Sequence, residues 1–202
     1  MEFERLVIPA AILVALTSLF QPIARKWWIN LGLLAIQYAG VFMLLGLEWP
    51  LSMAMTTLIA GWMACVVLAM VILGMPTTSA ADTLFYDPQR NVSPIFYLMT
   101  AIFMGIIVSS ATPFVSQWIP GIQFYQTWSG LILIGFGFLR IGFSYYPLPI
   151  CIGILTLLSG FEILYASMDG SLFVAGSLAA VSLGLALAGA YLQVVPTMEE
   201  NR

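Results

Sequence analysis

The chain has 202 residues, of which 61% are hydrophobic and 7% are charged, with a formal net charge of −3 and a mean hydropathy of +1.02. A soluble domain of this length carries far more charge, so the composition indicates a polytopic membrane protein. Histidine is absent, and Cys65 and Cys151 lie in separate apolar runs, which excludes an ordinary haem, zinc or iron–sulfur site built from this chain. The chain has no basic patch, so we expect no nucleic-acid partner.

Long apolar runs without alternation predict seven transmembrane helices, because backbone polar groups in lipid must be satisfied within each segment. A helix of about 20 residues crosses the roughly 30 Å of hydrocarbon in a bilayer. The expected spans cover about 6–23, 29–47, 51–74, 94–117, 127–144, 148–167 and 171–193. Prolines near most of the expected ends support this division. Acids at Glu2 and Glu4, with no basic region, do not indicate a cleaved signal peptide.

Basic residues fall almost wholly on one side of these seven spans. That side holds Arg25, Lys26, Arg90, Arg140 and Arg202, and the other side holds Arg5. The positive-inside rule then predicts an external N-terminus and a cytoplasmic C-terminus. Arg140 lies about one turn from the end of its span, so we expect its side chain to snorkel to the interface.

A weak repeat is visible at an offset of about 120 residues, where Gly40–Leu44 falls against Gly160–Leu164, and Leu68 against Ala188. We therefore predict an all-α fold of two parallel three-helix repeats joined by one extra helix. In this division, residues 1–74 form the first repeat, 75–93 a cytoplasmic loop, 94–117 the connecting span, and 118–202 the second repeat with a short C-terminal tail.

Glu162 lies inside the sixth expected span, several residues from its end. A carboxylate there costs on the order of 3 kcal/mol on membrane-insertion scales. Two interpretations stay open: the side chain reaches headgroups or water near the hinge at 168–170, or it is a buried acid that faces other helices and relays protons or ions. At helical spacing it shares a face with Ser159, Tyr165 and Asp169. The first two could hydrogen-bond the carboxyl group, and Asp169 would extend the polar stripe.

Gln37, near the middle of the second span, is a further relay candidate. The alternative is that its amide makes an interhelical hydrogen bond worth about 0.6 kcal/mol. The chain contains no nucleophile–base pair, phosphate loop, dinucleotide fingerprint or metal motif. We therefore expect no enzyme activity, catalytic residue, cofactor or metal site in this chain alone.

Two stretches resemble a known family of membrane subunits. The first comprises Leu16–Phe20, the basic turn Arg25-Lys26 and the helix NLGLLAIQYAGVFMLLG, and the second is SGFEILYASMDGSLFVAGSLAAVSLGLALAGAYL. Together they resemble the hydrogenase-4 component E family, which are seven-span subunits of group 4 hydrogenases and formate hydrogenlyase-type complexes. Each half of that family is similar to complex I subunit K and to the C subunit of Mrp-type sodium/proton antiporters.

The resemblance implies that Glu162 corresponds to the acid on the second helix of subunit K, which belongs to the polar axis of the membrane arm. One departure is that the third helix of subunit K carries a second acid, whereas the matching stretch 179–184 has none. A complete proton wire through this chain alone is therefore not expected.

The implied function is that of a non-catalytic membrane subunit in a complex I-like or group 4 hydrogenase-like complex that translocates protons or sodium ions. Its expected partners are antiporter-like subunits and the quinone or hydrogenase modules, within a lipid bilayer. Two alternatives stay open. One is a self-standing small ion or solute transporter or channel, and the other is a purely structural membrane-anchor subunit.

Overall fold

The computed structural model describes residues 2–24, 26–74, 94–118, 121–168 and 170–199, with side chains within 7–24, 26–74, 95–118, 121–168 and 170–193. The described residues form seven helices and the all-α class is as predicted. The helices are α1 (Glu2–Phe20), α2 (Trp27–Leu45), α3 (Leu51–Leu73), α5 (Pro94–Trp118), α6 (Phe124–Phe143), α7 (Pro147–Ala166) and α8 (Leu172–Glu199). Each expected span overlaps one helix, with ends that differ by several residues. The loop expected at 75–93 lies outside the described residues.

Five helices are long and apolar enough to cross a membrane. They are α2, α3 and α7, together with Ile95–Trp118 of α5 and Leu172–Gln193 of α8. The apolar part of α1, Val7–Phe20, is shorter. α6 has 20 residues but is not among these five helices, and it includes the polar side chains of Gln126 and Arg140. With this many apolar helices, the chain is a membrane protein.

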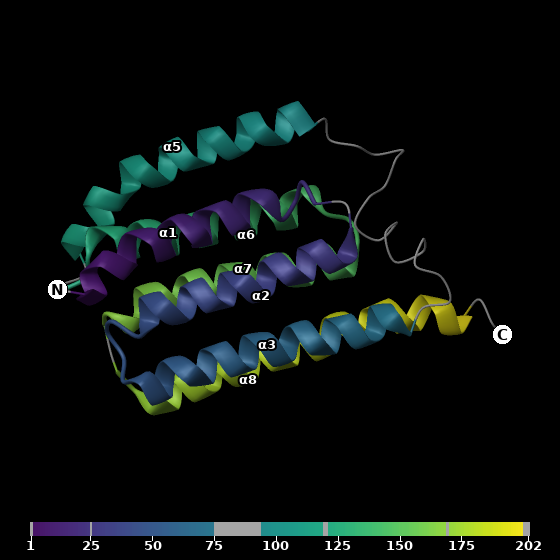
Figure 1. Cartoon of the computed structure of the whole chain (residues 1–202). Coiled ribbons are helices and arrows are strands. Elements are labelled where there is room, and N and C mark those ends of the chain that lie inside the picture. The colour runs from purple at the N-terminus through teal and green to yellow at the C-terminus, as the bar shows by residue number, and fades with distance from the viewer. Residues whose placement is uncertain (1, 25, 75–93, 119–120, 169, 200–202) are drawn as a thin grey trace.

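The helices stack in two layers (Figure 1). We call α1, α2 and α3 the first layer, and α6, α7 and α8 the second layer. Between the layers α1 packs on α6, α2 on α7 and α3 on α8, while α5 packs on the outer side of α6. The colours of Figure 1 show that each first-layer helix runs in the same direction as the second-layer helix on which it packs, whereas α5 runs opposite to α6. The start of α1 and the end of α8 lie at opposite ends of the bundle (Figure 1).

The closest helix pair is α6 and α7. A Cβ atom at Gly160 of α7 would lie 2.5 Å from the carbonyl oxygen of Gly130 on α6. A Cβ atom at Gly137 would lie 2.8 Å from the carbonyl oxygen of Gly153. No side chain fits at these distances, so glycine at these crossings allows the two backbones to approach. This approach bears on the candidate site, because α6 carries the buried Arg140 and α7 the buried Glu162.

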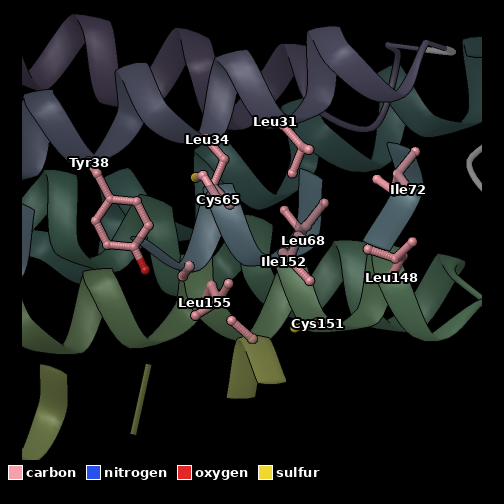
Figure 2. Packing of buried hydrophobic residues seen from close by; sticks show 12 residues of the cluster. Leu31, Leu34, Tyr38, Cys65, Leu68, Ile72, Leu148, Cys151, Ile152 and Leu155 are labelled. Carbon is pink, nitrogen blue, oxygen red and sulfur yellow. The ribbon is translucent and has the colours of Figure 1, made fainter. Parts of the chain in front are cut away.

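Between the layers lies a buried cluster drawn from α2, α3, α7 and α8 (Figure 2). Its labelled members are Leu31, Leu34, Tyr38, Cys65, Leu68, Ile72, Leu148, Cys151, Ile152 and Leu155. Lipid tails are as apolar as these side chains, so close packing and interhelical hydrogen bonds hold such helices together. The cluster therefore packs α2, α3, α7 and α8 against one another.

Candidate functional site

Glu162 lies on the face of α7 that is turned into the bundle, and its side chain is 2% exposed. Ser159 and Ala166, one helical turn away on either side, are buried too. The carboxyl oxygen Oε2 has no hydrogen-bond partner among the described residues. This burial favours the interpretation of an acid that faces other helices over one that reaches the headgroups. A buried acid with an unsatisfied oxygen is a functional-site candidate in a membrane protein.

Tyr38 of α2 extends from the first layer toward Glu162. Its side chain is 1% exposed, and its ring lies against Gly61 of α3, where a Cβ atom would overlap the ring. Figure 2 shows its hydroxyl group pointing across the layers toward α7. The side chains of Ser159, Ser182 and Glu162 lie near that hydroxyl. It nevertheless has no hydrogen-bond partner among the described residues.

Both serine hydroxyls are bonded within their own helices. Ser159 donates to the carbonyl oxygen of Leu155 at 2.9 Å, and Ser182 donates to that of Leu178 at 3.0 Å. Each hydroxyl proton is thus engaged, and each oxygen keeps its lone pairs as acceptors. We call Glu162, Tyr38, Ser159 and Ser182 the Glu162 centre.

Helical spacing gave Glu162 three candidate neighbours, of which Ser159 and Tyr165 lie among the described residues. The Ser159 hydroxyl donates its proton to the carbonyl oxygen of Leu155, because a helical serine in apolar surroundings readily reaches the carbonyl four residues back. Its oxygen can still accept a hydrogen bond from a protonated carboxyl group. Tyr165 is half-buried and stacks on Phe161, with ring centroids 6.0 Å apart. Asp169 lies outside the described residues.

Arg140 of α6 is buried, with 4% of its side chain exposed, so the expected snorkelling is wrong. Its Nε donates to the carbonyl oxygen of Pro149 at 3.2 Å, and Nη1 donates to Gln21 Oε1 at 3.3 Å. Nη2 donates to Asn30 Oδ1 at 2.9 Å. These acceptors come from the α1–α2 connection and the first turns of α2 and α7, and together they hold the guanidinium group inside the bundle. No carboxylate of the described residues pairs with it.

The network around Arg140 continues into the layers through two amides. Gln21 Nε2 donates to Gln37 Oε1 at 3.1 Å, which is the hydrogen bond to a neighbouring segment considered for Gln37. The hydroxyl of Thr156 on α7 donates to the carbonyl oxygen of Ile152 at 2.9 Å and lies 3.5 Å from Gln21 Oε1. Gln37 Nε2 has no partner among the described residues. Asn30 is itself held by hydrogen bonds to the carbonyl oxygens of residues 24 and 26. We call Arg140, Gln21, Asn30, Gln37 and Thr156 the Arg140 centre.

The two centres are joined by α7. Pro149, Thr156, Ser159 and Glu162 are all buried on this helix, and the 14 residues from Pro149 to Glu162 span a rise of roughly 20 Å. A line of buried polar groups therefore runs along α7, from the Arg140 centre near the start of the helix to the Glu162 centre near its end.

Several members of these two centres were not identified from the sequence. Gln21 and Asn30 lie at helix ends, where polar residues are ordinary, and Tyr38 has the pattern of an apolar core residue. A usable signal was that Arg140, Gln21 and Asn30 all occur near the same predicted membrane face, where their side chains can meet.

Among the described residues, no group of three or more Cys, Asp or Glu side chains could hold a metal ion. No protein-family model, curated protein or solved structure matches the chain. What the two centres can do therefore follows from their chemistry: one offers an acid and a phenol that can exchange protons, and the other holds a fixed positive charge.

Proposed function

We propose that this protein is a non-catalytic membrane subunit of a complex I-like or group 4 hydrogenase-like redox complex that translocates protons or sodium ions. It packs beside antiporter-like subunits, and Glu162 serves as a relay acid. The redox chemistry takes place on other subunits. The protein resides in a prokaryotic inner or plasma membrane, with its N-terminus outside and its C-terminus in the cytoplasm.

The observation that carries this proposal is the state of Glu162 and Tyr38. Both are buried, and both present an oxygen that has no hydrogen-bond partner among the described residues. A buried polar atom without a partner costs about 1–3 kcal/mol, so its retention calls for a functional reason. An acid beside a phenol and two hydroxyl oxygens can accept a proton and pass it on through a bound water molecule.

The arrangement of the helices supports the family resemblance. In the proposal, all seven helices span the membrane, and the two layers are the two parallel repeats. Each first-layer helix packs along its second-layer counterpart and runs in the same direction (Figure 1). Two copies of one three-helix unit, placed face to face in the same orientation, would have this arrangement. α5 then supplies the additional crossing that returns the chain to the side on which the second unit begins.

Gentle purification of the tagged protein from its native membrane tests the subunit role. We expect antiporter-like and redox subunits to co-purify, identified by mass spectrometry. Isolation of the protein alone or as a homo-oligomer would contradict the proposal and favour the self-standing transporter.

Replacement of the acid tests the relay role. We expect Glu162→Gln to leave assembly intact and to reduce redox-driven ion translocation in membrane vesicles, because the amide cannot release a proton. The matched control is Glu48→Gln, which makes the same chemical change at an exposed acid between α2 and α3. Normal translocation in Glu162→Gln would remove the relay role and leave the structural one.

A further inference from the structure

Arg140 brings a permanent positive charge into the bundle, because a guanidinium group stays protonated in proteins. The partners that it contacts are neutral: two side-chain amides and one backbone carbonyl. A buried cation that meets dipoles but no carboxylate keeps its long-range field. This charge has no part in the relay role proposed for Glu162, and its burial therefore calls for a separate explanation.

The position of Arg140 is at one end of the buried polar line. Its guanidinium group lies beside the α1–α2 connection and the first turn of α7, whereas Glu162 lies four residues before Ala166, where α7 ends. A proton or metal ion that entered from the α1–α2 connection would pass Arg140, Gln21 and Thr156 before it reached Ser159 and the Glu162 centre.

The field of the guanidinium group acts on any such ion. At an effective dielectric constant of about 20, a like charge that approaches to 4 Å is disfavoured by on the order of a thousandfold in occupancy. An arginine side chain placed in a pore is a known means of excluding protons and other cations. The amides of Gln21 and Asn30 hold Arg140 in place, so the charge cannot swing away from the line.

We propose that Arg140 is a charge barrier that closes its end of the polar line to protons and metal cations, so that Glu162 exchanges protons only from the opposite end of the bundle. The inference rests on the proposed role of Glu162 as a proton-exchanging acid. It adds a second functional residue, which acts by its charge and takes no part in proton transfer.

The test is a proton-leak assay on the full-length protein reconstituted into liposomes that contain a pH-sensitive dye, with valinomycin and potassium to compensate the charge. We expect wild-type liposomes to be tight and Arg140→Gln to leak at least tenfold faster. Arg140→Lys keeps the charge and should stay tight. The control Lys26→Gln removes an exposed positive charge at the same end of the bundle, and it should stay tight as well.

Gln21→Glu provides a second variant that keeps the arginine. The new carboxylate neutralises the guanidinium charge while still accepting its hydrogen bond, and Gln37 can turn its unpartnered Nε2 toward it. The fold should therefore survive, and we again expect a leak at least tenfold above wild type. If Arg140→Gln fails to fold, this variant decides the question.

The double variant Arg140→Gln/Glu162→Gln tests whether the line leads to the acid. A return to the wild-type leak rate supports the proposal, whereas an undiminished leak overturns the link to Glu162. If Arg140→Gln and Gln21→Glu are folded by gel filtration and thermal unfolding but as tight as wild type, the barrier itself is overturned. The assay needs no partner subunit, so this result is distinct from a failure of the proposed subunit role.

Discussion

The Arg140 centre and the Glu162 centre are buried between the same two layers, but their hydrogen bonding differs. Each nitrogen atom of the Arg140 guanidinium group donates a hydrogen bond, and two of the acceptors are tied to further groups. In the Glu162 centre, Glu162 Oε2 and Tyr38 Oη have no partner among the described residues. The polar atoms of the Arg140 centre thus have nearly all their hydrogen bonds, whereas the Glu162 centre keeps two oxygen atoms without a partner among the described residues.

The difference separates two uses of polar groups in a membrane bundle. A satisfied network fixes the relative position of the elements that supply it, which here are the α1–α2 connection, α2, α6 and α7. An unsatisfied group gains nothing for stability, and it is free to exchange protons or to bind water. We therefore expect stability to depend mainly on the Arg140 centre and ion movement mainly on the Glu162 centre.

The largest expected effect comes from breaking the helix pair that carries both centres. Gly160→Leu would force a side chain into the backbone of α6, where even a Cβ atom meets the carbonyl oxygen of Gly130 at 2.5 Å. We expect a loss of about 3 kcal/mol or more and little folded protein. The measurement is the monodisperse yield on gel filtration in detergent. Gly176→Leu, at a position on α8 with open space, is the matched control and should leave the yield unchanged.

The comparison of the two centres predicts that replacing Arg140 costs more stability than replacing Glu162. Arg140→Met would leave Gln21, Asn30 and the carbonyl of Pro149 without their donor, and we expect a loss of about 3 kcal/mol. Glu162→Gln removes no hydrogen bond from Oε2, so its loss should stay below about 1 kcal/mol. Thermal unfolding of both variants in one detergent measures the difference. Equal losses would contradict the division of roles.

Removal of the Tyr38 hydroxyl tests whether this group of the Glu162 centre contributes to stability or to ion translocation. Tyr38→Phe deletes a buried hydroxyl that has no hydrogen-bond partner among the described residues, so stability should stay the same or rise by up to about 1 kcal/mol. Ion translocation should fall if the hydroxyl takes part in the relay. Tyr97→Phe is a matched control, because its hydroxyl is also buried and unpartnered but belongs to α5. A clear loss of stability in Tyr38→Phe would show that the hydroxyl is bonded.

The smallest expected effect is at Gln37, the member of the Arg140 centre that has an unpartnered nitrogen atom. Gln37→Leu removes one hydrogen bond to Gln21 and also removes the unpartnered Nε2. We expect a loss of about 0.6 kcal/mol or less, the average for an interhelical hydrogen bond in a membrane. Chemical unfolding in mixed micelles can resolve the change against wild type. A loss above 2 kcal/mol would show that Gln37 contributes more to the Arg140 centre than this one hydrogen bond.

The apolar runs were sufficient to predict the all-α class and the approximate place of each helix. The burial of Glu162 was one of two readings of its position inside a span, and the sequence did not choose between them. The hydrogen-bond partners of the buried side chains could not be predicted from the sequence. Arg140 bonds to Gln21 and Asn30, which are 119 and 110 residues distant in the chain, and neither has a residue type that demands such a partner.

What the sequence by itself determined is the hydrophobic length and the helical character of the segments, because in lipid each segment must satisfy its own backbone. What only the tertiary structure decided is which polar side chains face one another. That depends on the rotation of each helix and on close approaches such as Gly130 against Gly160. An apolar surface on every side of a helix leaves its rotation open, and packing against its neighbours selects the face that turns inward.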